Sequence, residues 1–275
     1  MIEDQIILVE CIGPVMHVTL SRPEVLNALN SDAHFLLDEA FNRFAGDSEL
    51  QIATITGSGD RSFCAGTDLK ARLNEETDRF PETGFAGLTE RFDLTKPVVA
   101  LVNGDAIGGG LEIILACDLA IAVEQARFGL PEPRVGLAAK GGLHRLARQI
   151  PMKHAMKIAL TGNLFDAQTA LEYGLINQIV EKKNFMRECQ CMLDTILECA
   201  PLSLRASKEM IQKGLSASSM EEAFKLNYPE HATMLSSYDT REGSKAFLEK
   251  RTPLWRGRLN EISVKENAWS ISTLK

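Results

Sequence analysis

The sequence of 275 residues has no apolar run near the roughly 18 residues that a helix needs to cross a bilayer. We also expect no secretory signal, because Glu3 and Asp4 stand where export requires a basic start followed by an apolar stretch. Hydrophobic residues make up 45% of the chain and charged residues 24%, which is typical of soluble globular proteins. We therefore expect a cytoplasmic protein with no membrane partner.

Motifs for metal binding and for nucleophilic catalysis are also missing. The five histidines are isolated, the six cysteines include no Cys-x-x-Cys pair, and no Gly-x-Ser-x-Gly elbow occurs. These absences argue against a zinc site and against serine hydrolase chemistry. They predict that the protein needs no metal and no organic redox cofactor, and that the cysteines are reduced, with many of them buried.

Cationic residues are outnumbered. Lysine and arginine total 30 against 37 aspartates and glutamates, which gives a formal net charge of -7. Non-specific nucleic-acid binding depends on cations that neutralise phosphates, so this balance predicts no nucleic-acid partner. An anionic ligand would need a local basic patch.

Strand and helix patterns alternate along most of the chain. Residues 6–11 and 15–20 are rich in β-branched residues around a Gly-Pro turn, which predicts a hairpin. Apolar residues recur at helical spacing over residues 31–44, with Ser31 or Asn30 as the N-cap. Short apolar strands follow, at residues 52–56, 98–102 and 119–123. This alternation predicts an α/β core.

Between the first two of these strands lies a polar segment, residues 74–84, that is either a solvated surface loop or a mobile lid over a ligand. After residue 180 helical patterns prevail, and Asp239 with Glu242 fits a capping box. We place the boundary between a core, residues 1–199, and a helical region, residues 200–275, whose last part from residue 261 is expected to be a loosely held tail.

A first candidate site follows the strand at residues 52–56. It is the segment FCAGTDL, residues 63–69. The small residues Ala65 and Gly66 let a ligand approach the backbone closely, so that the N–H of Thr67 can point at a ligand oxygen. Taken alone, such an Ala-Gly pair is more often a simple turn.

A second candidate site is the segment GGGLE, residues 108–112, which leads from a strand into an apolar run. Three glycines would destabilise a helix interior, so we place them at a helix mouth, where free N–H groups and the helix dipole favour negative charge. A nucleotide phosphate loop is the rival interpretation, but neither Gly-x-Gly-x-x-Gly nor a Walker ending is present. Glu112 suits the dipole of a first helical turn even without catalysis.

Glu132 lies between Pro131 and Pro133. The following proline disfavours helical geometry and the preceding one stiffens the chain, which predicts an extended residue with a fixed direction. The alternative is a carboxylate on a solvent-facing loop. Two prolines around one acid favour the functional interpretation.

These motifs together resemble the crotonase superfamily of enoyl-CoA hydratases and isomerases. The resemblance rests on FCAGTDL (residues 63–69), KPVVALVNG (96–104), GGGLE (108–112) and ARFGLPE (126–132), in that order and with the two glutamates 20 positions apart. It covers nearly the whole chain, up to FLEKR at residues 247–251. The implied fold is a core of ββα superhelical turns with a C-terminal helical region that forms trimers.

The resemblance also implies roles for individual residues. The N–H groups of Thr67 and Gly109 would form an oxyanion hole for a thioester carbonyl, and Glu112 and Glu132 would be the two catalytic acids of a hydro-lyase. It implies coenzyme A as part of the substrate and a homotrimer or homohexamer. The residues implied to contact the substrate or its coenzyme A are Arg22, Ala65, Gly66, Asp68, Leu69, Lys70, Gly108 and, from a neighbouring subunit, Phe247 and Lys250.

Two further segments, GFAGLTE (residues 84–90) and EKRTPLWRG (249–257), are similar to those of carnitinyl-CoA dehydratases. One departure lies in GLAAKGG, residues 136–142, which is one residue shorter than is usual after the second glutamate and carries Lys140. This shortened loop is therefore expected to reshape the acyl pocket. The open alternatives are an isomerase, a CoA thioester hydrolase, or a scaffold that binds CoA esters or RNA without turnover.

Overall fold

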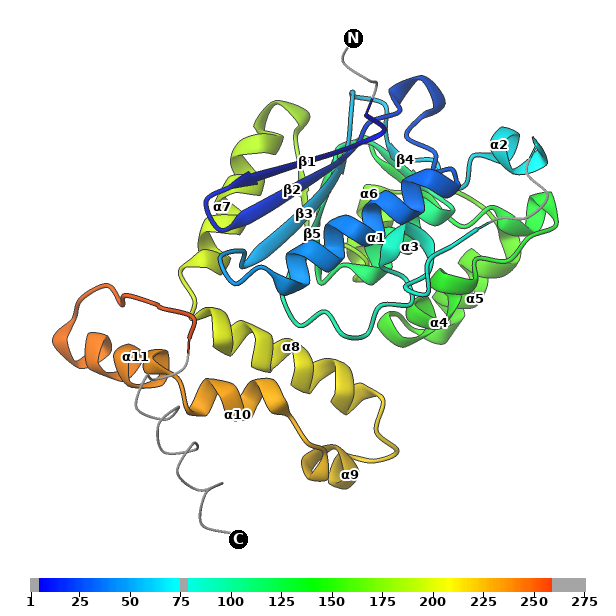
Figure 1. The fold of residues 1–275 in the computed structure, drawn as a ribbon. Helices are drawn as coiled ribbons and strands as arrows, with labels where there is room; N and C mark the ends of the chain where they lie inside the picture. Colours follow the sequence, from blue (N-terminus) through cyan, green and yellow to red (C-terminus); the bar gives the residue numbers. More distant parts are fainter. Residues whose placement is uncertain (1–4, 75–78, 259–275) are drawn as a thin grey trace, which may run out of the picture. The chain divides into compact units, whose positions relative to one another are not determined.

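The computed structural model describes residues 5–74 and 79–258 (Figure 1). The chain divides into two compact units. Unit 1 comprises Met1–Leu94 and Val98–Met192, and unit 2 comprises Thr95–Pro97 and Leu193–Lys275. The division therefore lies at residue 192, earlier in the chain than the boundary that we placed at residue 199.

Unit 1 contains a large sheet of six strands in the order β1-β2-β3-β5-β7-β10. The predicted hairpin is confirmed, because β1 and β2 pair antiparallel, and every other neighbouring pair in this sheet is parallel. The three predicted core strands, β3, β5 and β7, lie side by side. The bounds are β1 Ile7–Ile12, β2 Val15–Leu20, β3 Ile52–Gly57, β5 Val98–Val102, β7 Leu119–Val123 and β10 Gln178–Val180.

A second, four-stranded sheet has the order β4-β6-β8-β9. Its strands are β4 Ser62–Cys64, β6 Asp105–Ile107, β8 Arg127–Gly129 and β9 Phe165–Asp166. Strands of the two sheets alternate along the chain, so that β3, β5 and β7 are each followed by a strand of the small sheet. This is the predicted ββα repeat, in which each superhelical turn adds one strand to each sheet.

The helices of unit 1 follow the strands. The predicted first helix is α1, which lies across one face of the large sheet (Figure 1), and its N-cap is Asn30, whose side chain accepts a hydrogen bond from the Ala33 N–H. Phe41 and Phe44 on its inner side are fully buried. The bounds are α1 Ser31–Gly46, α2 Leu69–Asn74, α3 Gly109–Ala116, α4 Lys140–Gln149, α5 Met152–Thr161 and α6 Ala167–Glu172, and α7, Phe185–Leu197, crosses the division. The 3-10 turns are η1 Pro23–Val25, η2 Phe85–Gly87, η3 Glu132–Val135 and η4 Lys182–Asn184.

Unit 2 is helical, as predicted, with α8 Pro201–Leu215, α9 Met220–Lys225, α10 Pro229–Leu235 and α11 Tyr238–Glu249. The predicted capping box is wrong, because α11 begins after Ser237 and Asp239 lies inside its first turn. The Asp239 carboxylate instead accepts hydrogen bonds from the backbone N–H groups of Arg256 and Gly257, both at 2.8 Å. Its neighbour Glu242 pairs with Arg251. These acids hold the segment after α11.

Some expectations are corrected or fall outside the described residues. Only Cys64 and Cys189 are buried, Cys117 is intermediate and the other three cysteines are exposed. No described helix is both long and apolar enough to cross a membrane. Residues 75–78 of the predicted loop or lid and the predicted tail from residue 261 lie outside the described residues.

Candidate active site

The carboxyl ends of β4, β6 and β8 bring the predicted site residues together. These three strands are parallel neighbours in the small sheet, so their carboxyl ends lie at one edge. Thr67 follows the last residue of β4 by three positions, Gly109 follows β6 by two, and Glu132 follows β8 by three. Segments that are more than 60 residues apart in the sequence thereby meet at one site.

The turn after β4 is held by the segment before α1. Leu29 donates its N–H to the Gly66 carbonyl and accepts from the Asp68 N–H, both at 2.8 Å. Because alternate peptide groups of an extended chain point to opposite sides, the N–H of Thr67 points away from Leu29. Within the described part of the chain, this N–H donates no hydrogen bond.

Each of the three consecutive glycines faces a different neighbour, and the helix mouth that we predicted is confirmed. A Cβ on Gly108 would come within 2.9 Å of the Glu132 carboxylate oxygen Oε1, and one on Gly109 within 2.2 Å of the Phe85 ring. A Cβ on Gly110 would lie 2.1 Å from the Cys64 carbonyl oxygen. A side chain at any of these positions would therefore push apart the parts of the site.

The first-turn N–H of α3 lies beside the turn after β4. A Cβ on Gly66, whose φ is +87°, would be only 2.8 Å from the backbone N of Gly109. Among the described residues the Gly109 N–H also donates no hydrogen bond, whereas the N–H groups of Leu111 and Glu112 both bond to the Gly108 carbonyl. Thr67 and Gly109 thus offer two unpaired donors on adjacent segments, which is the arrangement of an oxyanion hole.

Glu112 is buried and acts as an acceptor at the start of α4. Its Oε1 accepts a hydrogen bond from the Gly142 N–H at 2.5 Å. Gly142 must be a glycine here, because a Cβ would lie 2.8 Å from the Glu112 Cγ. The carboxylate caps a helix whose N-cap residue, Ala139, has no capping side chain, and its charge suits the helix dipole.

The pKa of Glu112 is nevertheless high. It is raised from 4.5 to about 7, mainly by burial and also by the neighbouring carboxylates of Glu132 and Glu90, while the N–H groups of Gly142 and Gly141 act to lower it. Both protonation states are therefore accessible near neutral pH. A carboxyl group in this condition can either accept or donate a proton.

Glu132 is not extended as predicted, because it begins the 3-10 turn η3. The turn is closed by the hydrogen bonds from Arg134 N–H to Pro131 O at 2.9 Å and from Leu137 N–H to Glu132 O at 2.9 Å, which offset the preference that Pro133 imposes on its predecessor. Burial raises the pKa of its carboxyl group. Oxygen Oε2 is buried, and no described residue hydrogen-bonds to it.

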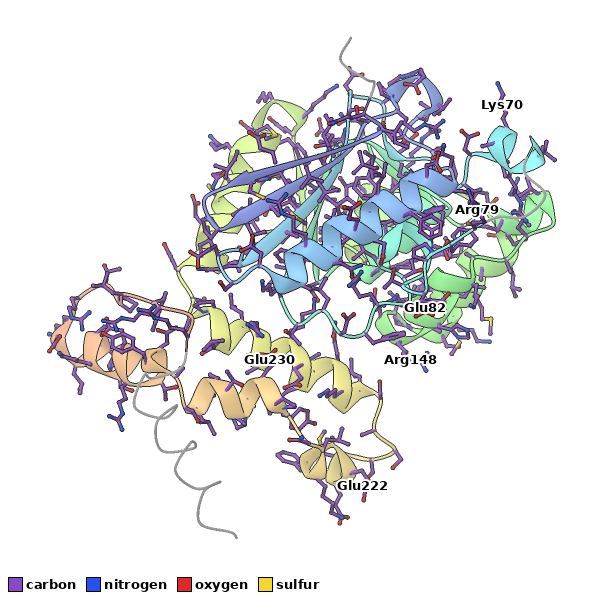
Figure 2. The ribbon with its side chains drawn as sticks, viewed as in Figure 1. Lys70, Arg79, Glu82, Arg148, Glu222 and Glu230 are labelled. Atoms are coloured by element: carbon purple, nitrogen blue, oxygen red, sulfur yellow. The ribbon has the colours of Figure 1, made fainter. Side chains whose placement is uncertain are left out.

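A cavity of about 460 Å³ within unit 1 opens onto these groups. Thr67, Glu112 and Glu132 line it, together with residues of the segment before η2, such as Glu82, which is labelled in Figure 2. The cavity thus joins Thr67 with both carboxyl groups, and the backbone N of Gly109 lies on the segment adjacent to the turn that carries Thr67. It has room for a small ligand group that places a carbonyl oxygen between the donors.

Phe85 and His34 support the wall beside the donors. The Phe85 ring packs on Gly109, and its centroid lies 4.4 Å from that of the His34 ring. His34 accepts a hydrogen bond from the Ala86 N–H at 3.1 Å, and burial lowers its pKa to about 4. His34 is therefore neutral near pH 7, and its role is to hold η2 against α1.

The residues implied to contact coenzyme A have different surroundings. Arg22 donates to the Asp68 carboxylate at 2.9 Å and to the Ala28 carbonyl at 2.7 Å, so its guanidinium ties the turn to the segment before α1. Ala65 is half-buried within this turn. Leu69 and Lys70 are exposed, and Lys70 extends outward from α2 in Figure 2. Phe247 and Lys250 are exposed residues of unit 2.

Sequence reasoning missed several residues of the site. Gly141 and Gly142 supply the N–H groups that face Glu112, and the pair of glycines at the start of a helix was the available signal. Glu90 ends the segment GFAGLTE and lines the cavity, as does Lys140. Nothing in the local sequence shows that these two charges meet.

Comparison with known proteins agrees with this geometry. Residues 11–258 match the family described as enoyl-CoA hydratase/isomerase. The chain belongs to this family, which is part of the crotonase superfamily.

Individual relatives cover almost the whole chain. It is 40% identical over 256 residues to a carnitinyl-CoA dehydratase from Salmonella typhi, covering 90% of this chain and 96% of the relative. A crystal structure of enoyl-CoA hydratase from Mycobacterium tuberculosis H37Rv has a TM-score of 0.83 and 37% identity over 92% of this chain and 99% of its own. A carnitinyl-CoA hydratase from Mycobacterium avium has a TM-score of 0.73 and 39% identity, with the same coverage.

Proposed function

We propose that the protein is a hydro-lyase that adds water reversibly, in the syn sense, to a 2-enoyl-CoA thioester. The observation that carries this proposal is a cavity lined by Thr67, by the buried Glu112 and by the half-buried Glu132. The unpaired N–H groups of Thr67 and Gly109 lie on adjacent segments of this site. In this proposal Thr67 and Gly109 bind the thioester oxygen. Their N–H groups stabilise the enolate-like charge that develops there, and the loss of one such donor typically costs about 3 kcal/mol.

The two glutamates divide the proton transfers. Glu132, in its protonated form, delivers a proton to Cα, and its buried, unpaired Oε2 suits a group that meets the substrate. Glu112, as a carboxylate, orients and deprotonates the water that attacks Cβ. The Gly142 N–H favours this charged form and fixes the direction of the carboxylate.

We assign the coenzyme A part of the substrate to residues according to their positions around the site. The turn of residues 65–70 would lie along the pantetheine, with Gly66 and Gly108 allowing its close approach and the exposed Lys70 near the phosphates. Arg22 would act mainly through Asp68, since its guanidinium is already bonded there. We further propose that the protein forms a homotrimer or homohexamer, in which Phe247 and Lys250 of a neighbouring subunit contact the coenzyme A. We also propose a cytoplasmic location.

The test is a kinetic assay with crotonyl-CoA. Hydration would remove the absorbance of the conjugated thioester without releasing a free thiol. Release of thiol would instead indicate a hydrolase, and migration of the double bond without uptake of water would indicate an isomerase. Binding of the ester with no reaction would leave the scaffold alternative.

A second candidate is a carnitinyl-CoA dehydratase-like reaction, in which water leaves a hydroxyacyl thioester that carries a quaternary ammonium group. The observation that favours it is the 40% identity to the Salmonella typhi protein. Crotonobetainyl-CoA assayed in parallel with crotonyl-CoA distinguishes the two candidates by their kcat/KM values.

A further inference from the structure

An ion pair lies in the cavity beside the catalytic groups. The Lys140 Nζ is 3.0 Å from Oε1 and 3.3 Å from Oε2 of Glu90, so one ammonium group bridges both carboxylate oxygens. Both residues line the same cavity as Glu112 and Glu132. Their side chains are partly or largely exposed, at 41% for Glu90 and 77% for Lys140, and are therefore accessible from the cavity.

Close packing of the backbone sets this pair side by side. A Cβ on Gly141 would lie 2.7 Å from the Thr89 Cβ, so the first turn of α4 rests directly on Thr89. Glu90 is the next residue after Thr89, and Lys140 is the residue before Gly141. The Glu90 N–H donates to the Thr83 carbonyl at 2.9 Å, and Arg145 donates to the Thr89 carbonyl at 3.0 Å, which anchors the carboxylate's backbone.

The pair lies on the same cavity as Glu112, the residue that acts at Cβ in the proposed reaction. Lys140 is two residues from Gly142, whose N–H holds the Glu112 carboxylate, and Glu90 is near enough for its charge to act on Glu112. In the proposed reaction Glu112 acts on the water at Cβ. The next atoms of the acyl chain are therefore within reach of both charges.

The Glu90 carboxylate is not free to bind a cationic substrate, because Lys140 already pairs with it. Apart from the catalytic pair, the ionisable groups that line the cavity are Arg72, Glu82, Glu90 and Lys140, whose formal charges cancel. A substrate ammonium group at Glu90 would have to displace Lys140 and would then face it as a like charge. Such a like-charge contact is a recognised way to exclude a competing ligand.

We propose that Lys140, by occupying the Glu90 carboxylate, is a specificity-determining residue that makes this site prefer uncharged acyl groups over acyl groups with a cation beyond Cβ. This inference rests on the proposed function, because it concerns the acyl group of that substrate. It predicts that the protein prefers a different substrate from the cationic one that the names of its carnitinyl-CoA relatives suggest.

The experiment compares two esters of one shape. One is crotonyl-CoA with a trimethylammonium group on Cγ, and the other is its carbon isostere with a tert-butyl group on Cγ. We expect the wild-type protein to have a kcat/KM at least about tenfold higher for the uncharged ester, since a like charge at close range costs that much or more. A preference of the wild type for the cationic ester would overturn the inference.

Two variants with opposite expected effects test the residues. Lys140→Gln should lower the ratio of the two kcat/KM values by raising that for the cationic ester, because the competing cation is gone. Glu90→Gln should raise the ratio, because Lys140 then loses its counter-charge. The matched control is Lys182→Gln, which removes a lysine paired with Asp60 at 3.1 Å that does not line the cavity, and should leave the ratio unchanged. An unchanged ratio in Lys140→Gln would refute the assignment.

Failure of the proposed reaction remains distinguishable. If neither ester is hydrated, calorimetry with the Glu132→Gln variant gives the Kd of both esters. Tighter binding of the uncharged ester there, reversed by adding Lys140→Gln, would support the specificity assignment without hydration. Equal Kd values would overturn it.

Discussion

Buried carboxyl groups in the two units have opposite surroundings. In unit 1, burial raises the pKa of Glu112 to about 7, and one oxygen of Glu132 has no hydrogen-bond donor among the described residues. In unit 2, Glu242 is only 4% exposed, yet its hydrogen bonds to Arg251 lower its pKa to about 2, with help from the Leu254 N–H. Burial is common to both. The supply of donors decides whether a buried acid is reactive or holds structure.

The largest effect is expected from Glu132→Gln. The variant keeps the shape of the side chain but cannot give a proton to Cα, so kcat should fall on the order of a thousandfold. The Kd for a CoA ester should change little, because the N–H groups of Thr67 and Gly109 remain. Stopped-flow kinetics and calorimetry measure both quantities, and full activity would refute the role of Glu132.

Gly108→Ala should lower activity by straining the backbone beside Glu132. Gly108 has φ 58° and ψ -124°, a conformation that other residues rarely adopt, and its Cβ would meet Glu132 Oε1 at 2.9 Å. A shift of this carboxyl group should lower kcat/KM on the order of a hundredfold. As a control, Gly136→Ala adds a methyl group that meets nothing within 4 Å, at a similarly positive φ of 73°. Equal losses in both variants would show that the effect is strain alone.

Glu112→Gln should stabilise the fold at alkaline pH. The pKa of Glu112 is about 7 in the folded state and 4.5 in the unfolded state, so above pH 4.5 the unfolded state loses this proton more readily. The free energy of unfolding therefore falls as the pH rises from 4.5 towards 7. At about pH 8 the variant should gain about 3 kcal/mol in free energy of unfolding, with little gain at about pH 4. Urea titrations at both pH values measure this. A loss at both would contradict the assigned pKa.

The pH dependence of activity should show the same group. If Glu112 acts as the base, log kcat/KM should fall with a slope near one below pH about 7, which is about tenfold per pH unit. The Glu112→Gln variant should retain a low activity without this limb. A limb that persists in the variant would assign it to another residue.

The smallest effect on activity is expected from Glu242→Gln, which tests whether the buried acid of unit 2 acts on stability alone. Its pKa of about 2 is below 4.5, so its contribution to stability is complete above pH 4.5 and is lost as the pH falls towards 2. The variant should melt at a lower temperature than the wild type at pH 7, and the difference should shrink near pH 3. We expect a kcat equal to that of the wild type. A large fall in kcat would contradict the assignment of a purely structural role to Glu242.

The sequence predicted the site better where the residue types allow only one position in the local structure. The glycines at residues 108–110 were expected at the start of a helix, and they lie there in the structure. Prediction failed where a local preference competed with hydrogen bonds that the sequence pattern did not reveal. Glu132 was expected to be extended because of Pro133, but hydrogen bonds close a 3-10 turn around it, and Asp239 was expected to cap α11 but bonds to Arg256 and Gly257 instead.

The amino-acid sequence by itself determined the α/β class, the order of the strands and helices, and the motifs that identify the superfamily. These properties follow from side-chain periodicity and from glycine geometry, which act over a few residues. Only the tertiary structure decided which N–H groups face Glu112, that Phe85 covers Gly109, and that Lys140 meets Glu90. Such contacts join segments that are remote in sequence, so they depend on how the two sheets and their helices pack, which no local pattern encodes.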